Sequence, residues 1–193
     1  MTPYLAPIEN PKGMRLKMLY RFLGKAFGKP PAWLTVQGAR MPVTFLMWMG
    51  KVSSLSKKLV LPDDMERLIR ARVDNLNMCT WCQDAGRWYV MTKDKDDKLL
   101  AKVDAVDEYR TSPLFSDTER AALDFATELT EQKHVGSETF NTLRQHFSER
   151  EICEIDWVVA TNHLFNINNL GLGISSDGLC ELAKPKLTAA QAG

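Results

Sequence analysis

The sequence predicts an all-α protein, and two observations carry this prediction. Apolar residues recur at helical spacing along most of the chain, whereas no alternating strand pattern of useful length is present. Two Ser-x-x-Glu capping boxes, residues 116–119 and 148–151, stand directly before apolar runs and mark helix starts. We therefore expect a helical bundle packed around a hydrophobic core.

The composition is that of a globular protein. The chain has 193 residues, of which 45% are hydrophobic and 25% charged, with a net charge of +1, so neither disorder nor a bias toward nucleic acid is indicated. The first residues lack a basic region followed by an apolar run, and no apolar stretch approaches the roughly 18 residues that span a bilayer. We expect a cytoplasmic protein with no nucleic-acid or membrane partner.

Three segments are expected along the chain: an arm with a basic amphipathic helix (1–37), a main domain (38–176) and a C-terminal tail (177–193). In the predicted helix 12–29, Met14, Met18 and Phe22 share one row, Leu19 and Leu23 the next, and the opposite face is basic. Such a helix suits an anionic surface. We favour instead a helix that docks on its own domain or on a partner subunit.

The main domain reads as a succession of helices. Pro42 and Pro62 suit first helical positions and open helices over 42–59 and 62–76. Further helices are expected from the CxxC motif, over 99–109, and from the two capping boxes, and Ser137 is expected to cap another. The last and longest helix, 152–170, should end at the glycines 171 and 173. The final residues, 188–193, are expected to fray.

The sequence Cys79-Thr80-Trp81-Cys82 is the one strong chemical motif. At a helix start, both sulfurs would lie on about the same face, close enough for a strained and therefore reactive disulfide. The partial positive charge of the helix N-terminus would favour the reactive thiolate. Trp81, between the cysteines, anchors a core or shapes a hydrophobic pocket for an organic substrate.

Three interpretations of the pair remain open, and a working dithiol is favoured over the other two. Two inert core cysteines are the first alternative. Half of a zinc site is the second, but none of its possible further ligands forms another close pair, so we expect no metal. Those ligands would come from Cys153, Cys180, His134, His146 and His163. We expect Cys153 and Cys180 to be buried structural thiols.

A polar stripe runs along the longest helix. Asn162, Asn166 and Asn169 recur at helical spacing beside His163. Because buried amides must be hydrogen-bonded, the stripe must meet polar groups on a neighbouring helix or subunit, or line a pocket. A structural network is the favoured interpretation.

The order of these elements, together with the motif, resembles the carboxymuconolactone decarboxylase and alkylhydroperoxidase D (AhpD) family. The resemblance covers residues 20–173. It lies in the helix 65–78, the CxxC motif, the segment 115–121 (Phe-Ser-Asp-Thr-Glu-Arg-Ala), the segment 162–166 (Asn-His-Leu-Phe-Asn) and Asn169-Leu170. It implies an all-helical domain that assembles as a homotrimer or homohexamer.

The resemblance also implies an activity. In the redox-active branch the second cysteine attacks a peroxide and the first resolves the product, so Cys82 would be peroxidatic and Cys79 resolving. The resulting sulfenic acid condenses to a disulfide that an external dithiol reduces. We therefore expect an antioxidant, peroxiredoxin-type oxidoreductase that reduces alkyl hydroperoxides or exchanges disulfides without a cofactor.

Two positions depart from the pattern of that branch. Its usual histidine four residues after the second cysteine is Gly86 here, and its glutamate twelve residues before the first is Arg67, with Glu66 one step away. The candidate catalytic residues are therefore Cys82, Cys79, His163 and Glu66, with Asp84 as a further acid or base. Arg67 would lower a thiol pKa if it pointed inward. The alternative is a non-catalytic or decarboxylase-type member with a structural or ligand-binding role, against which the retained CxxC argues.

Overall fold

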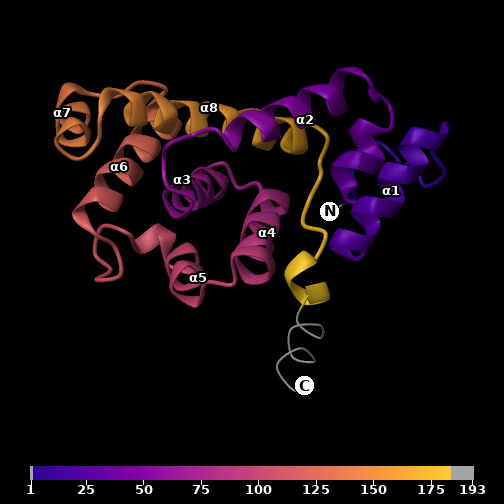
Figure 1. The fold of residues 1–193 in the computed structure, drawn as a ribbon, viewed down its shortest axis with the longest axis horizontal. Coiled ribbons are helices and arrows are strands. Elements are labelled where there is room, and N and C mark those ends of the chain that lie inside the picture. The colour runs from indigo at the N-terminus through magenta and orange to yellow at the C-terminus, as the bar shows by residue number, and fades with distance from the viewer. Residues whose placement is uncertain (1, 184–193) are drawn as a thin grey trace.

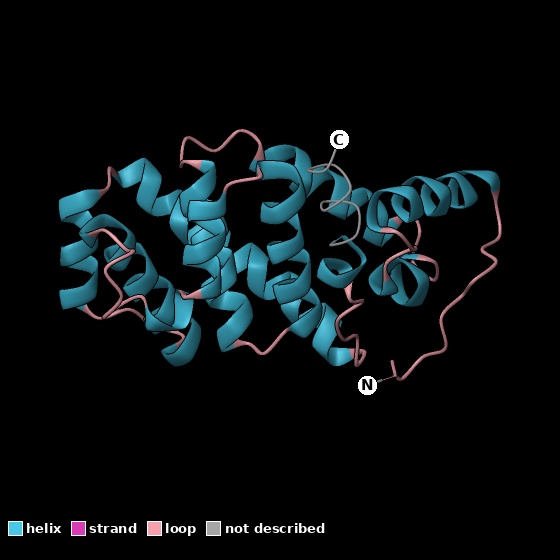
Figure 2. Ribbon diagram, turned by 90° about the horizontal axis from the view of Figure 1, so that it is seen from below, coloured by secondary structure: helices cyan, strands magenta, loops and turns pink. Residues whose placement is uncertain are grey.

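A computed structural model describes residues 2–183, and all regular structure in that range is helical (Figure 2). The all-α prediction is confirmed. The α-helices are α1 (Met14–Phe27), α2 (Thr44–Ser56), α3 (Asp63–Leu76), α4 (Thr80–Tyr89), α5 (Asp97–Asp104), α6 (Asp117–Gln132), α7 (Ser137–His146) and α8 (Glu149–Gly171). Short π-helical segments η1 (Leu34–Gly38) and η2 (Val90–Asp94) and a 3-10 turn η3 (Val106–Glu108) connect them.

Helix α3 lies at the centre of the fold, packed against α4, α6 and α8 (Figure 1). The apolar row of α3 is buried over most of its length, and Leu68, Ile69 and Val73 have no exposed surface. The largest hydrophobic cluster joins this row to α6, α7 and α8, with Ile155 of α8 also fully buried. The helix that precedes the CxxC motif is therefore fixed by the core on several sides.

The helix starts predicted at the two capping boxes are confirmed. Ser116 and Ser148 form complete capping boxes with Glu119 and Glu151. The prediction that Ser137 caps α7 is wrong: Gly136 is the N-cap, and no side chain caps that helix. The carboxylate of Glu128 accepts the Gly136 N–H at 2.8 Å. This bond fixes Gly136 as the N-cap, one residue before the predicted cap Ser137.

The other helix bounds differ in detail from those predicted. The expected helix 42–59 is shorter, because α2 covers only Thr44–Ser56. The prediction that Pro42 and Pro62 are first helical residues is wrong: Pro42 precedes the N-cap of α2, and Pro62 is itself the N-cap of α3. The expected helix 99–109 begins earlier and is interrupted. Its first part, α5, is capped by the Asp96 side chain, and η3 follows as a separate turn.

Helix α1 packs mainly against neighbouring parts of the chain, in a cluster that includes Leu34 of η1 and Leu46 of α2. Leu16 and Tyr20 are buried, and the Tyr20 hydroxyl donates to the carbonyl of Ile8 at 2.7 Å. Leu19 and Leu23 pack against this cluster, but the row of Met14, Met18 and Phe22 is exposed. Only part of the expected apolar face is therefore docked: the row of Leu19 and Leu23 packs, and the row of Met14, Met18 and Phe22 does not. No helix in residues 2–183 combines the length and apolar character needed to cross a membrane.

The chain after α8 returns across α4 (Figure 1). Asp177 accepts the backbone N–H of Ala32 at 2.8 Å and the Trp81 indole N–H at 2.7 Å, and it pairs with Lys29. Leu179 is fully buried at the start of a helical segment. The first part of the expected tail therefore ties the N-terminal region to α4, whereas residues 188–193 lie outside the described range.

Candidate active site

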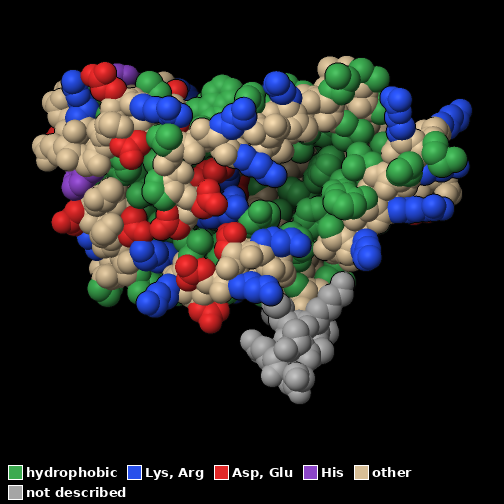
Figure 3. All heavy atoms as spheres, in the orientation of Figure 1, with side chains coloured by type: hydrophobic (Ala, Val, Ile, Leu, Met, Phe, Trp, Pro, Cys, Tyr) green, Lys and Arg blue, Asp and Glu red, His purple; other side chains and the backbone are tan. Residues whose placement is uncertain are grey.

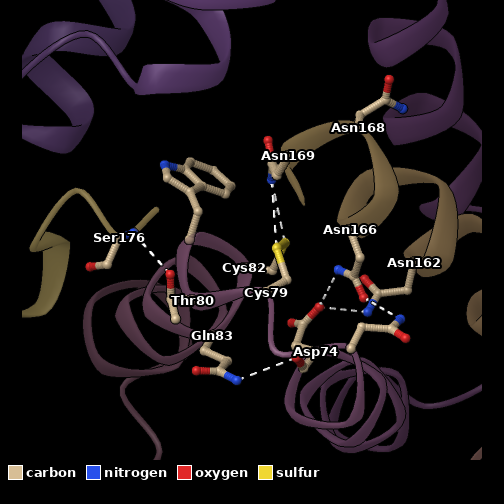
Figure 4. The surroundings of a disulfide bond; sticks show 12 residues. Asp74, Cys79, Thr80, Cys82, Gln83, Asn162, Asn166, Asn168, Asn169 and Ser176 are labelled. Carbon is tan, nitrogen blue, oxygen red and sulfur yellow. Dashed lines mark hydrogen bonds between the residues drawn. A yellow bond between two sulfur atoms is a disulfide. The ribbon is translucent and has the colours of Figure 1, made fainter. Parts of the chain in front are cut away.

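The two cysteines of the motif are joined as a disulfide at the start of α4. Cys79 is the N-cap residue, so the expected position at a helix start is confirmed. Met78, with a left-handed φ of 54°, turns the chain from α3 into α4, and the Cys79 N–H donates to the Asp74 carbonyl at 3.0 Å. Asn169 of α8 points its amide at both sulfurs, 3.4 Å from Cys82 Sγ and 3.8 Å from Cys79 Sγ (Figure 4).

The two cysteines differ in their access to a cavity. A cavity of about 420 Å³ lies between the N-terminal region and the α3, α4 and α8 helices, and Cys82 lines it. Cys79 has no exposed surface and is not among the lining residues. Figure 3 shows this hollow lined mainly by hydrophobic side chains, with basic side chains along one edge. Its apolar walls include Phe27, Trp33, Phe45, Met49, Trp81 and Phe165.

Asp74, in the last turn of α3, lines the same cavity as Cys82. One of its oxygens, Oδ1, accepts the amides of Asn162 and Asn166, each at 2.7 Å (Figure 4). Burial raises the pKa of this carboxyl to about 7, although the two amides and the nearby Arg70 act in the opposite direction. A group that can take up and release a proton near neutral pH therefore shares the cavity with the thiol.

The expected polar stripe of α8 performs both roles that the sequence left open. Asn162 and Asn166 meet a polar group of a neighbouring helix, Asp74, while Asn162 and Asn169 also line the cavity. Asp74 is the site residue that the sequence analysis missed. The signal was indirect, since a stripe of buried amides requires a polar partner without identifying it.

Glu66 is buried but does not belong to the cavity wall. Its carboxylate binds the guanidinium of Arg70, with Oε1 at 2.8 Å from Nε and 2.7 Å from Nη2. Arg70 in turn donates from Nη1 to Asn162 at 3.2 Å. Glu66 therefore reaches the Asp74 network only through Arg70, and the structure gives it no contact with either sulfur.

His163 also lies away from the residues that line the cavity. The Asn77 amide donates to Nδ1 at 3.2 Å, and Nε2 lies 3.1 Å from the Thr130 hydroxyl. Because Nδ1 accepts a hydrogen bond, the ring is neutral and donates from Nε2. Burial lowers its pKa, and Lys133 lowers it further. These contacts are those of a structural network between α3, α6 and α8.

The two positions that depart from the family pattern both face the cavity. A side chain built at Gly86 would meet only Asp74 Oδ2, at 3.8 Å from its Cβ. Arg67 lines the wall, and its Nε donates to Asp94 at 3.1 Å while its guanidinium lies 4.2 Å from the centre of the Tyr89 ring. The structure thus leaves an open position beside the Asp74 carboxyl.

The remaining candidates have structural contacts. Asp84 accepts the backbone N–H groups of Leu179 and Cys180 and the Ser176 hydroxyl; burial opposes its ionisation, but these bonds lower its pKa overall. Cys180 is buried as expected, and burial raises its pKa to about 11. The prediction that Cys153 is buried is wrong, because α8 turns it to solvent. In the described range, no group of three or more His, Cys, Asp or Glu side chains could hold a metal ion.

Comparison with known proteins gives relatives of low sequence identity and high structural similarity. No family model matches the chain. The protein YnjA of Escherichia coli (strain K12) is 26% identical over 172 residues, which cover 82% of this chain and 92% of YnjA.

Two solved structures match most of the chain. A cysteine-to-alanine variant of the debrominase Bmp8, in complex with 2,3,4-tribromopyrrole, superposes with a TM-score of 0.77 at 19% identity, covering 96% of this chain and 98% of Bmp8. A peroxidase-related protein of Ralstonia eutropha JMP134 with an alkylhydroperoxidase AhpD core gives a TM-score of 0.69 at 20% identity, covering 90% and 95%. The protein therefore has the all-α AhpD-like fold, with its CxxC pair joined as a disulfide at the start of α4.

Proposed function

We propose that the protein is a CxxC-dependent thiol peroxidase that reduces organic hydroperoxides. The observation that carries this proposal is the asymmetry of the pair: Cys82 faces an apolar cavity, and Cys79 lies fully buried directly behind it. A thiol that meets the substrate and a second thiol within bonding distance are the two parts that such a reaction needs. The similarity to peroxidase-related proteins of this fold supports the same activity.

The proposed reaction begins with the reduced pair. The Cys82 thiolate attacks one peroxide oxygen, the O–O bond breaks, and the alkoxide leaves as an alcohol after it takes up a proton. Cys82 becomes a sulfenic acid. The Cys79 thiolate then attacks Cys82 Sγ and water leaves, which forms the disulfide seen in the structure. An external dithiol reduces the disulfide, so one hydroperoxide and two thiols give one alcohol, one water and one disulfide.

Asp74 is the proposed acid and base of this reaction. As a carboxylate it accepts the proton of the Cys82 thiol, and as a carboxylic acid it returns this proton to the departing alkoxide. A pKa of about 7 makes both forms accessible near neutral pH. The residues Glu66 and His163 act at a distance: Glu66 orients Arg70 beside Asn162, and His163 holds Asn77 against Asn166.

Asn169 is proposed to bind the sulfurs throughout the cycle. Its amide N–H groups point at both sulfur atoms in the disulfide form. A hydrogen bond to a thiolate favours the charged form and so lowers the thiol pKa. Together with the start of α4, whose partial positive charge lies at Cys79, this amide replaces part of the missing histidine.

Reductive dehalogenation of an aromatic substrate is the second candidate function. It is favoured by the aromatic wall of the cavity and by the similarity to the debrominase Bmp8. Here the Cys82 thiolate would take the halogen as a sulfenyl halide, and Asp74 would protonate the carbanion. Cys79 would then displace halide and form the same disulfide, so that two thiols supply the two electrons.

Turnover by the reduced protein tests these proposals. We would supply dithiothreitol with cumene hydroperoxide in one assay and with tribromopyrrole in another, and follow hydroperoxide loss, bromide release and disulfide mass. We expect hydroperoxide turnover that is lost in Cys82→Ser, and a sulfenic acid that can be trapped in Cys79→Ser. Cys153→Ser is the matched control, because it removes an exposed thiol remote from the cavity and should retain full activity.

The outcomes separate the candidates. Bromide release without hydroperoxide turnover would favour the dehalogenase. No turnover of either substrate, with no disulfide formed, would reject dithiol chemistry and support a non-catalytic, ligand-binding role.

We also propose that the protein forms a homo-oligomer. Helix α8 exposes a set of large apolar side chains, with Trp157 43%, Leu164 43% and Ile167 61% exposed. Clustered apolar surface of this kind is typical of a subunit interface. Light scattering coupled to gel filtration should give a trimer or hexamer, and Ile167→Asp should shift it toward the monomer; a wild-type monomer at micromolar concentration would contradict this.

A further inference from the structure

Three arginines line the cavity, and two of them are fully engaged by the protein. Arg70 uses Nε and Nη2 to bind Glu66 and Nη1 to bind Asn162. Such an arginine already has its acceptors in place, and a ligand would have to displace them.

Arg87 is the second engaged arginine. Its Nε and Nη2 bind the two oxygens of Asp104 at 2.7 and 2.8 Å, and its Nη1 contacts the sulfur of Met91. This bidentate pair occupies the Nε–Nη2 edge of the guanidinium, one of the edges through which an arginine binds a carboxylate.

Arg67 differs from both. Its Nε donates to Asp94, and its guanidinium stacks on Tyr89, but Nη1 and Nη2 have no hydrogen-bond partner among residues 2–183. Its side chain is only 21% exposed, so these donors are partly removed from water. The stacking and the single ion pair hold the group in place while leaving its two terminal nitrogens available.

The cavity that Arg67 lines is open at Gly86, beside Asp74, and apolar over part of its wall. No side chain extends from Gly86, where a Cβ would come no closer than 3.8 Å to Asp74. Aromatic and aliphatic side chains such as Trp33, Phe45 and Phe165 form one part of the remaining wall, and amide side chains with the carboxyls of Asp74 and Asp104 form another. The cavity therefore joins an apolar chamber, the Cys82 sulfur and one guanidinium with free donors.

We propose that the substrate is an organic acid, whose apolar body fills the aromatic chamber and whose carboxylate binds Nη1 and Nη2 of Arg67. This inference rests on the proposed function for the reacting group, a hydroperoxide directed at Cys82. A carboxylate fits better than a phosphate ester, because a single guanidinium with two free nitrogens matches two oxygens and one charge. Arg67 is then a specificity-determining residue rather than part of the redox chemistry.

Binding of unreactive ligands tests the inference independently of catalysis. We would measure binding of 4-isopropylbenzoate and of its methyl ester by calorimetry to the disulfide form. We expect the acid to bind about tenfold or more tightly than the ester, as for a partly buried hydrogen bond between charged groups. Arg67→Gln should abolish the difference. Arg87→Gln removes the same charge from the same cavity and should preserve it.

Equal binding of acid and ester by the wild type would overturn the inference, as would an acid preference that survives in Arg67→Gln. A parallel assay with 4-carboxycumene hydroperoxide and its methyl ester separates this result from the proposed function. Acid-selective binding without any turnover would support the anchor and reject the peroxidase. Turnover that depends on Cys82 but is equal for acid and ester would do the reverse.

Discussion

The two walls of the cavity are built in different ways. On one side, α3 and α8 bring a dense set of buried residues and a polar network in which Asp74, Asn162 and Asn166 bind one another. On the other, α1 and α2 bury only Leu16 and Tyr20, and Phe45 and Val52, respectively. The first wall and the adjoining start of α4 carry the reacting groups Asp74 and Cys82. The residues that the second wall contributes to the cavity, Phe27, Trp33, Phe45 and Met49, are all apolar.

This difference indicates a division between chemistry and recognition. Reacting groups need fixed positions, which a packed core and saturated hydrogen bonds supply. A recognition wall tolerates variation, because a substrate body needs apolar contact more than exact placement. Changes in the core and in the polar network of the first wall should therefore affect stability and the chemical step together. Changes in the second wall should affect mainly substrate affinity, as should changes at Arg67.

The largest contrast is expected in stability. Ile155→Ala removes a fully buried side chain from the cluster between α3, α6 and α8, and should lower the free energy of unfolding by about 2–5 kcal/mol. Leu16→Ala acts in the small cluster of α1 and should cost less. Urea unfolding followed by circular dichroism measures both. Equal losses would mean that the two regions are packed equally well, contrary to the comparison.

Asp74→Asn should have the next largest effect, on activity. Loss of a general base typically lowers the rate by about 10²–10⁴-fold. Because the carboxylate form must accept the thiol proton, wild-type kcat/KM should rise as pH passes through about 7. In the variant this rise of kcat/KM with pH should be absent. Asn retains an oxygen for Asn162 and Asn166. A pH profile of the variant that matches the wild type would remove Asp74 from the mechanism.

The same carboxyl gives a prediction for stability against pH. Burial raises its pKa from an ordinary value of 3.8 to about 7, so between these values the folded protein binds more protons than the unfolded chain. Stability should therefore fall as pH rises through this window, by about 1.4 kcal/mol for each unit of pKa shift at most. Arg70 and its partner Glu66 are the charged groups beside it. Thermal unfolding of Asp74→Asn in the disulfide form should show a flatter profile.

The sequence predicted the position of the cysteine pair better than its surroundings. The position of Cys79 and Cys82 at a helix start follows from local pattern, and so does the need of Asn162 and Asn166 for a polar partner. Asp74 was not identified, because its role depends on contacts with a helix far along the chain. Its partner Asn162, for example, lies 88 residues later. Such pairing across the core is set by tertiary packing and leaves no local signal.

Arg67 and Glu66 illustrate the same limit. Adjacent residues on a helix point about 100° apart, so one faces the cavity and the other the interior. The sequence showed that Arg67 occupies a position of interest, yet only the structure shows that it lines the cavity and that Glu66 is taken up by Arg70. Which side of a helix faces a cavity depends on the helices around it.

Phe45→Ala tests whether the second wall of the cavity contributes to substrate binding. Phe45 lies in the cavity wall, 6.0 Å from Trp33 between ring centres. Removing this ring should raise KM for an aromatic hydroperoxide about tenfold, since a buried aromatic contributes roughly 1–3 kcal/mol of apolar contact, while kcat should change little. Met47→Ala on the same helix, 70% exposed, is the control. A fall in kcat with unchanged KM would place Phe45 in the chemistry.

The smallest effect on stability is expected at the N-terminal cap of α8, a helix of the first wall. Ser148 accepts the Glu151 N–H and forms a capping box at the start of α8, so Ser148→Ala should lower the free energy of unfolding by about 1 kcal/mol. Ser137 begins α7 without capping it, and Ser137→Ala should be nearly neutral. Chemical denaturation can resolve the two. An equal loss at Ser137 would show that its hydroxyl supports α7 in solution, and would restore the cap that the sequence predicted.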